Sequence, residues 1–303
     1  MTTTDSRYEF GRNWTRYVKR SFNDERLEIA KRHLLTLIGR NDLQGVEFLD
    51  IGCGSGIHSL AAFRAGAERI HSFDYDPDSV RATELVREYA GKPSTWTVER
   101  GDVLDEAYLA TLGKWRFVYS WGVLHHTGDV WRALANAQRL VTDGGTFYIA
   151  LYSAEMQKDP EFWLRIKQEY NKADSLKRWR MECWYVWNYV MCRRIWRLPH
   201  LIKRIVEYRF SRGMSFFADV RDWLGGWPMQ FVHDQEVVDF LEGKCGFKLV
   251  NIKTGEACTE FVLYRPPSPQ YRPPCPRSFA FAGILASATF LEKPKSAYPD
   301  NAS

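Results

Sequence analysis

The sequence predicts an α/β protein with a doubly wound, mostly parallel sheet, and two observations lead to this class. Five short apolar stretches alternate with helical patterns between residues 45 and 152, and such alternation is typical of βαβ units with helices on both faces of the sheet. A glycine-rich turn directly follows the first of these stretches. We therefore expect a binding pocket at the carboxyl ends of the strands, where a doubly wound sheet reverses its order.

The glycine turn joins an expected strand over 45–50 to an expected helix over 58–63. Glycines at positions 52, 54 and 56 remove the Cβ atoms that would keep a ligand away from the backbone, and they permit positive φ values. The spacing is G-x-G-x-G, which differs from the pattern of dinucleotide-binding proteins and from the phosphate-binding P-loop. The turn alone indicates a nucleotide-like ligand, and a purely structural turn is the alternative.

The later strands of this region end in polar residues. Asp74 closes the second strand and lies 22 residues beyond Gly52, the position at which a ribose hydroxyl pair needs an acceptor. Asp102 closes the third strand, and the pair His125 and His126 closes the fourth. We expect these four strands over 68–74, 96–103, 116–126 and 144–151.

Together these pieces resemble the class I S-adenosylmethionine-dependent methyltransferases. The resemblance covers roughly residues 45 to 152, in the family's order, and implies a seven-stranded, Rossmann-like sheet with S-adenosyl-L-methionine as cofactor and no metal. The family often has an acid where this chain has Arg116, a departure that affects only packing. The matching segments are 49–56, 73–77, 101–103, 120–126 and 139–145.

The resemblance implies a role for each residue around the cofactor. Asp50 would neutralise the methionine ammonium, Asp74 would accept from the ribose hydroxyls, and Asp102 would accept from the adenine amino group. A helix-capping or turn role is the alternative for Asp50 and Asp102. The remaining expected contacts come from Gly52, Cys53, Gly54 and Gly56 to the methionine portion, Tyr75 and Val103 to the adenine, and Ser120 and Trp121 at the border with the acceptor.

The histidine pair follows a strand at the edge where ligands bind. If the acceptor is a hydroxyl or a phenol, a proton must leave, and His125 or His126 could take it near neutral pH. We favour His126, because the chain after Leu124 should turn towards the acceptor. The alternative is that one histidine caps the next helix while the other shapes the pocket.

Before the sheet, residues 1–44 are expected to form a lid and a helix. Residues 7–22 are rich in aromatic and basic side chains, and Asn23-Asp24 should cap a helix that runs through Ile38. In methyltransferases that resemble this chain, the segment ahead of that helix folds over the cofactor. Trp14 would then contact the substrates, and ordinary surface packing is the alternative.

The pattern changes after residue 153, where we expect a helical insertion over 153–231. It holds seven of the twelve tryptophans, and Lys177 to Arg212 contains ten lysines and arginines against two acids. Pro199 should divide this stretch into two helices. Three interpretations remain open: a cap over a substrate pocket, a surface for a lipid-linked or membrane-bound substrate, and an RNA-binding face.

The last part of the chain should complete the sheet. We expect a helix and two strands over 232–265, followed by a proline-rich, loosely attached tail over 266–303. Four residues are weaker candidates for contact with the methyl acceptor: Tyr152, Trp223, Trp227 and Glu260.

Composition limits the classes of protein that fit. Of 303 residues, 45% are hydrophobic, and the net charge of +5 permits a phosphate-bearing partner without requiring one. Six cysteines form no C-x-x-C pair, so we expect a reduced, cytoplasmic protein without a zinc site. The first residues lack the features of a signal peptide, and no apolar run is long enough to span a bilayer.

Three functions are compatible with the sequence. The first is methylation of an oxygen or nitrogen on a small molecule that is sugar-derived, phenolic or quinol-like. The closing part of the insertion, Asp222 to Pro228, resembles segments of a bacterial methyltransferase group often associated with glycan or secondary-metabolite pathways. The second is RNA modification with the basic insertion as docking surface. The third is a catalytically silent cofactor-binding partner protein.

Overall fold

The computed structural model describes residues 8, 10–11, 13–15, 18, 23–157, 159–211, 216–255 and 257–267. Residues 268–303 of the expected loose tail, 266–303, lie outside the described residues, as do several members of the 7–22 segment. Within the described residues, seven strands form one sheet in the order β3-β2-β1-β4-β5-β7-β6. The strands are β1 (Glu47–Ile51), β2 (Arg69–Asp74), β3 (Trp96–Arg100), β4 (Trp115–Trp121), β5 (Val141–Tyr152), β6 (Lys248–Thr254) and β7 (Cys258–Tyr264).

The pairing confirms the predicted fold class. Strands β1 to β5 are all parallel to one another, while β7 runs antiparallel between β5 and β6. The strand expected over 116–126 ends earlier, at Trp121, because Gly122 has a φ of 74°, outside the extended region. His125 and His126 therefore lie in a short 3₁₀ turn, Leu124–His126, after the strand.

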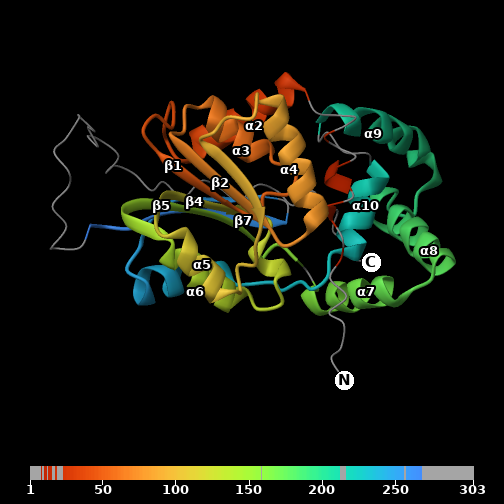
Figure 1. Cartoon of the computed structure of the whole chain (residues 1–303). Helices are drawn as coiled ribbons and strands as arrows, with labels where there is room; N and C mark the ends of the chain where they lie inside the picture. Colours follow the sequence, from red (N-terminus) through yellow and green to blue (C-terminus); the bar gives the residue numbers. More distant parts are fainter. Residues whose placement is uncertain are drawn as a thin grey trace. The chain divides into compact units, whose positions relative to one another are not determined.

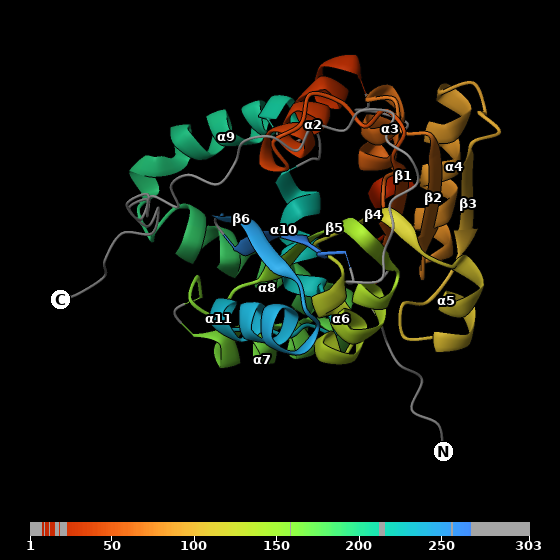
Figure 2. The same ribbon diagram turned by 90° about the vertical axis from the view of Figure 1, so that its left-hand side faces the viewer.

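Four of the helices around the sheet, α2, α4, α5 and α6, begin at side-chain caps. The helix expected after Asn23-Asp24 is present, with Asn23 accepting from Arg26 N, and Asp76, Asp105 and Asp129 cap later helices in the same way. In both views α2, α3 and α4 cover one face of the sheet, and α5, α6 and α11 cover the other (Figures 1 and 2). These helices are α2 (Asp24–Leu37), α3 (Ile57–Arg64), α4 (Pro77–Tyr89), α5 (Glu106–Leu112), α6 (Val130–Arg139) and α11 (Asp234–Val238), which continues as a π-helical turn, Asp239–Lys244.

Each face of the sheet has its own core. Phe48 and Leu49 are neighbours on β1 and fully buried, yet they belong to different clusters because successive strand residues point to opposite faces. Phe48 packs among residues of α2 and α3, whereas Leu49 packs with α6 residues such as Leu134. Burial on both faces explains why the strands contain continuous apolar runs.

Between β5 and α11 the chain forms four helices, which we call the cap: α7 (Pro160–Lys172), α8 (Ser175–Tyr185), α9 (Leu198–Ser211) and α10 (Phe216–Gly225). Pro199 lies in the first turn of α9, as predicted, since a helix tolerates proline at its start. The cap has a core of its own, which includes Trp163, Tyr170 and Leu224. Figure 1 shows the cap on the right, beyond the ends of β1 and β2. No helix in the described part of the chain is long and apolar enough to cross a membrane.

Candidate functional site

The glycine turn lies between β1 and α3. Gly52, Gly54 and Gly56 have φ values of 75°, 54° and 76°, which L-residues with a side chain rarely adopt. A Cβ on Gly52 would overlap the side chain of Val123, and a Cβ on Gly54 would lie 3.3 Å from Trp14 Nε1. Only a turn without side chains can therefore let the chain after β4 and the N-terminal segment approach its backbone this closely.

Asp74 lies beside this turn at the end of β2. Its Oδ2 accepts from Gly54 N over 3.0 Å, and its Oδ1 accepts from Asp76 N over 2.9 Å. Burial raises the pKa of Asp74 to about 6, although these backbone hydrogen bonds oppose the rise. Tyr75 follows it with an exposed ring, which Arg100 faces at 5.5 Å. An acceptor carboxylate and a ring thus stand next to the glycine turn.

Asp50 lies deeper than the turn that follows it. Its side chain is buried, and it accepts a hydrogen bond from Ser59, which also bonds to Ser72 over 2.7 Å. Trp96 Nε1 donates to the same Ser72 hydroxyl. Burial raises the pKa of Asp50 to about 7, against the hydrogen bond from Ser59. Among the described residues this carboxyl group is held by the core, and its expected contact with an ammonium group stays a prediction.

Side-chain hydrogen bonds hold the backbone in place at the ends of β3 and β4. Asp102 Oδ1 accepts from Leu104 N over 2.9 Å, and the carbonyl of buried Val103 accepts from Asn136. Ser120 is buried and donates to Ile51 O over 3.0 Å, which ties β4 to β1. Cys53, the remaining turn residue expected at the cofactor, is buried and accepts from Thr83.

Trp121, at the end of β4, is joined to Glu260 of β7. The indole Nε1 donates to Glu260 Oε2 over 3.2 Å, and the Tyr148 hydroxyl donates to the same carboxylate. Burial opposes ionisation of Glu260, but hydrogen bonds from His33, Tyr148 and Trp121 outweigh it and lower its pKa. The Trp121 ring itself is 42% exposed. Glu260 therefore positions an accessible ring at the edge where the expected site lies.

The two histidines have different surroundings. His125 is fully buried, and its Nδ1 accepts from Tyr152 N over 3.3 Å, while its Nε2 has no partner in the described structure. His126 is partly exposed, and its Nδ1 lies 2.8 Å from Pro228 O. Because a carbonyl only accepts, the proton of neutral His126 is on Nδ1 and Nε2 keeps a free lone pair.

Burial holds both histidines in the neutral form. It lowers the pKa of His126 to about 3, although the hydrogen bond to Pro228 opposes the shift, and it lowers the pKa of His125 well below its usual value. No other described residue hydrogen-bonds to Nε2 of His126. Nε2 of neutral His126 therefore keeps an available lone pair, while His125 supports the Tyr152 backbone and contacts its ring at 4.1 Å.

The described residues of the N-terminal segment, 8–18, lie across this edge. Phe10 contacts the His126 ring at 5.2 Å, and Gly11 N donates to Asp76 at the start of α4 over 2.7 Å. Tyr8 N donates to Trp227 O over 2.9 Å, so Trp227 contacts this segment through its backbone. With Trp14 against Gly54, the described residues of the segment lie against both the glycine turn and the histidine, and its role as a lid stays a prediction.

Sequence reasoning missed two buried ionisable residues of the cap. Lys167 of α7 is 1% exposed, donates to Trp223 O and lies 4.4 Å from the Trp223 ring. Asp222 of α10 accepts from Asn13 over 2.7 Å. Burial lowers the pKa of Lys167 to about 7 and raises that of Asp222 to about 7. The spacing of Trp163, Lys167 and Tyr170, which places a lysine in an apolar helical stripe, was the available signal.

These side chains meet in one aromatic cluster. Tyr152 contacts the rings of His126 at 5.6 Å and Trp223 at 5.8 Å, and Lys167 is close enough to both histidines to lower their pKa values. Three of the four expected acceptor-side residues, Tyr152, Trp223 and Trp227, thus lie on this side of the site. Glu260 lies with Trp121 instead.

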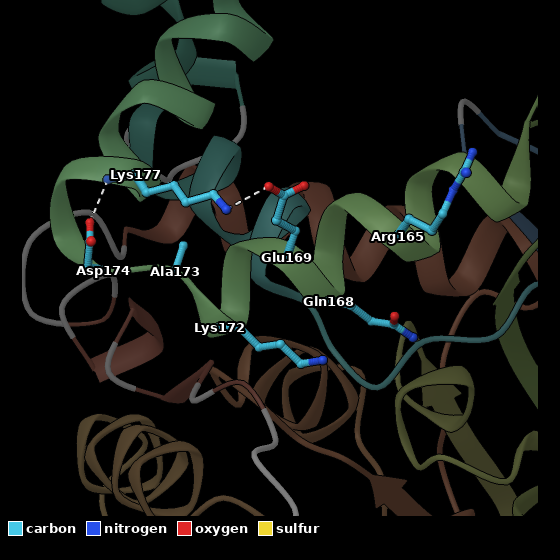
Figure 3. Close-up of a pocket in the computed structure, with 7 residues that line it drawn as sticks. All are labelled: Arg165, Gln168, Glu169, Lys172, Ala173, Asp174 and Lys177. Carbon is cyan, nitrogen blue, oxygen red and sulfur yellow. Dashed lines mark hydrogen bonds and ion pairs between the residues drawn. The ribbon is translucent and has the colours of Figure 1, made fainter.

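Two pockets open away from this edge. One of about 420 Å³ lies where α7 meets α8, and Figure 3 shows that polar and charged side chains line it, with Lys177 pointing to Glu169 at 2.8 Å. The other, of about 720 Å³, lies at the opposite ends of the strands beside Glu47, Arg69 and Trp115. Neither contains a residue expected at the cofactor.

Comparisons with known proteins identify the family of the chain. A family model described as a methyltransferase domain matches residues 15–203. The ribosomal protein L11 methyltransferase of Xanthomonas campestris pv. campestris (strain 8004) is 50% identical over 55 residues, which are 18% of each chain. The ubiquinone biosynthesis O-methyltransferase of Methylobacterium sp. (strain 4-46) is 28% identical over 128 residues, 42% of this chain and 49% of that protein. The chain thus matches less than half the length of these relatives.

Solved structures share the fold. An O-methyltransferase family protein from Burkholderia thailandensis superposes with a TM-score of 0.51 at 10% identity, covering 85% of this chain and 59% of that one. A chain in the complex of the Haloferax volcanii Trm112 methyltransferase activator with a putative methyltransferase gives 0.50 at 14% identity, covering 86% of this chain and 100% of that one. The family match spans more than half of the sequence, and so the chain belongs to the methyltransferase domain family, with S-adenosylmethionine as its cofactor.

Proposed function

We propose that this methyltransferase transfers the methyl group of S-adenosylmethionine to an oxygen or nitrogen of a small-molecule acceptor, of a sugar-derived, phenolic or quinol-like kind. The single observation that carries the proposal is His126. Its Nδ1 is committed to Pro228 O, so Nε2 is a free base among aromatic rings at the carboxyl ends of the strands. A proton acceptor in that place is what a hydroxyl or phenol acceptor needs.

The residues at the glycine turn fit the cofactor. The positive-φ glycines offer close approach to the backbone, and Asp74 offers carboxylate oxygens for a hydroxyl pair. We assign Gly52, Gly54 and Gly56 to the methionine portion, Asp74 to the ribose, and Tyr75 and Asp102 to the adenine. The bound cofactor supplies an electrophilic methyl carbon attached to a sulfonium.

The protein's part is positioning and proton removal. The acceptor oxygen or nitrogen forms a bond to the methyl carbon while the bond from that carbon to sulfur breaks, and the acceptor's proton passes to His126 Nε2. Phe10, Tyr152 and Trp223 enclose the place where this happens and keep water away. Tyr152 and Trp223 offer an aromatic acceptor flat, apolar contacts.

RNA modification is the second candidate, favoured by the excess of basic residues between Lys177 and Arg212. In the experiment, the full chain and methyl-labelled S-adenosylmethionine are incubated in separate reactions with a pool of phenols and quinols, a pool of sugars, and a pool of RNA. Label in a small-molecule pool supports the proposal. Label in RNA alone contradicts it, and label in no pool, although the chain binds the cofactor, favours a catalytically silent partner protein.

A further inference from the structure

The outer side of the cap exposes an unusual amount of apolar surface. It lies along α8, α9 and the chain between them, which form the right-hand edge of the cap in Figure 1. Aliphatic and aromatic side chains there are between 40% and 73% exposed. Contiguous exposed apolar surface usually marks an interaction site. We call this set the outer cap surface: Leu176, Trp179, Trp187, Ile195, Trp196, Leu198, Ile202 and Val206.

Helix α9 shows that this exposure is organised. Leu198, Ile202 and Val206 are spaced four residues apart, so they lie on one face of the helix, and each is at least 45% exposed. Leu201 and Ile205 directly precede Ile202 and Val206 in the sequence, and they pack against the cap core. The apolar face of α9 is therefore wider than the core that covers it, and its outer half faces solvent.

Helix α8 repeats the arrangement. Leu176 and Trp179, three residues apart, are 63% and 59% exposed. Further along the helix Met181 and Tyr185 pack against the cap core, and Glu182 is buried and accepts from Tyr170 and Arg221. The start of α8 thus adds exposed apolar side chains to the outer side of the cap.

Cations accompany the apolar residues. Arg180, one helical turn after Leu176, and Arg193 and Arg194 are exposed, and Arg194 lies 5.9 Å from the Trp196 ring. Of the two acids between Lys177 and Arg212, Glu182 is already paired with Arg221 at 3.1 Å. The outer cap surface is therefore both apolar and positively charged.

We propose that the outer cap surface binds the face of an anionic lipid bilayer, with α8 and α9 lying in the interface. Aliphatic side chains of α9 enter the boundary of the acyl chains, and Trp179, Trp187 and Trp196 lie at the level of the headgroups, where indoles are favoured. The arginines contact lipid phosphates. This inference is independent of which acceptor the enzyme methylates.

Two other occupants fit less well. RNA binding uses aromatic rings that stack on bases, and Leu198, Ile202 and Val206 offer none. A second copy of the chain, packed face to face about a two-fold axis, would bring Arg180 and Arg194 against the same cationic surface, and like charges repel. An anionic lipid surface offers acyl chains to the aliphatic side chains and phosphates to the arginines.

The test is flotation of the full chain with vesicles of phosphatidylcholine alone or mixed with phosphatidylglycerol. We expect the chain to float with the mixed vesicles, to remain largely free with the neutral ones, and to be released as salt is raised. Brominated acyl chains should quench the tryptophan fluorescence on binding. Absence of flotation with anionic vesicles overturns the proposal.

Matched variants decide whether this surface is responsible. Ile202→Ser should lower vesicle partitioning about tenfold, since burial of one such side chain contributes roughly that much. Ile29→Ser is the control, because Ile29 is 51% exposed on α2 and Ile202 is 55% exposed on α9. Equal partitioning of the two variants contradicts the proposal.

Charge variants separate lipid from the other occupants. Arg180→Gln combined with Arg194→Gln should reduce binding to anionic vesicles several-fold, whereas Lys114→Gln with Arg116→Gln should not. Two results would contradict the lipid proposal. Sedimentation that shows a dimer, broken by Ile202→Ser, would assign the surface to a second copy of the chain. RNA binding that is lost in the arginine variant, by a chain that binds no vesicles, would assign the surface to RNA.

Discussion

Asn13 Nδ2 donates a 2.7 Å hydrogen bond to Asp222 Oδ1 and thereby joins the N-terminal segment to α10 of the cap. The same carboxyl group is hydrogen-bonded to the Tyr8 hydroxyl, and Gly11 N holds the segment to Asp76 of α4. Tyr8 and Asn13 are therefore bonded to the cap, and Gly11, which lies between them in the sequence, is bonded to α4.

Asn13→Ala should loosen this attachment. A hydrogen bond to a charged acceptor contributes about 1.5–3 kcal/mol, so we expect S-adenosylmethionine to dissociate about tenfold faster and the segment to be cut sooner by protease. Asn251→Ala is the control, because the Asn251 amide also makes a 2.8 Å hydrogen bond, to Leu37 O, far along the chain from the site. Equal protease sensitivity of both variants would show that Asn13 does not hold the lid.

Gly52→Ala should lower the stability and the cofactor affinity by more than the strain of a positive φ alone. Gly52 and Gly91 have φ values of 75° and 86°, but a Cβ meets Val123 at Gly52 and nothing within 4 Å at Gly91. Both variants carry the backbone strain of about 1–2 kcal/mol, and only Gly52→Ala also forces the chain after β4 to move. Urea unfolding and cofactor titration of the two variants check this. Similar losses in both would mean that the turn has room for a side chain.

His126→Ala should separate binding from chemistry. Loss of a general base typically lowers turnover by ~10²-fold or more, while the cofactor contacts at Gly52 to Gly56 and Asp74 are left in place. Single-turnover kinetics and cofactor titration measure the two effects. The exposed His200 gives the control variant, His200→Ala. Unchanged turnover in His126→Ala removes it as the base.

The low pKa of His126 predicts how acid affects stability. The folded-state pKa is about 3, below the ordinary value of 6.5, so between these values the unfolded chain binds a proton that the folded chain does not. Stability is therefore lost as the pH falls from about 6.5 towards 3. His126→Gln should reduce this loss by ~1–2 kcal/mol between about pH 7 and pH 4.5, as measured by urea midpoints. An unchanged pH dependence would contradict the burial of a neutral imidazole.

Much of this fold could be predicted because it follows from local sequence patterns. Apolar runs gave the strands to within a few residues, and Asn23 was identified as a cap from residue type alone. The glycine turn and Asp74 lie 20 to 22 residues apart in sequence, and the βαβ connection brings them together, with Asp74 accepting from Gly54 N. Short-range rules suffice for such a site.

The acceptor side could not be predicted in the same way. Asn13 and Asp222 are 209 residues apart, and no local pattern pairs them. Lys167 looks like a surface lysine until Trp223 is known to pack over it. The difference between His125 and His126 depends on the carbonyl of Pro228 and the backbone of Tyr152, which only tertiary structure supplies.

Calorimetric titration with S-adenosylmethionine tests the central claim, which is that the cofactor binds at the glycine turn beside Asp74. The wild-type chain, Asp74→Asn and Asp105→Asn are compared, since Asp105 also accepts two backbone hydrogen bonds, at the start of α5, where asparagine caps as well as aspartate. We predict binding by the wild type, an increase in Kd of about tenfold or more for Asp74→Asn, and no change for Asp105→Asn. A folded wild-type chain that binds no cofactor, or an Asp74→Asn variant that binds as tightly as wild type, would contradict the account.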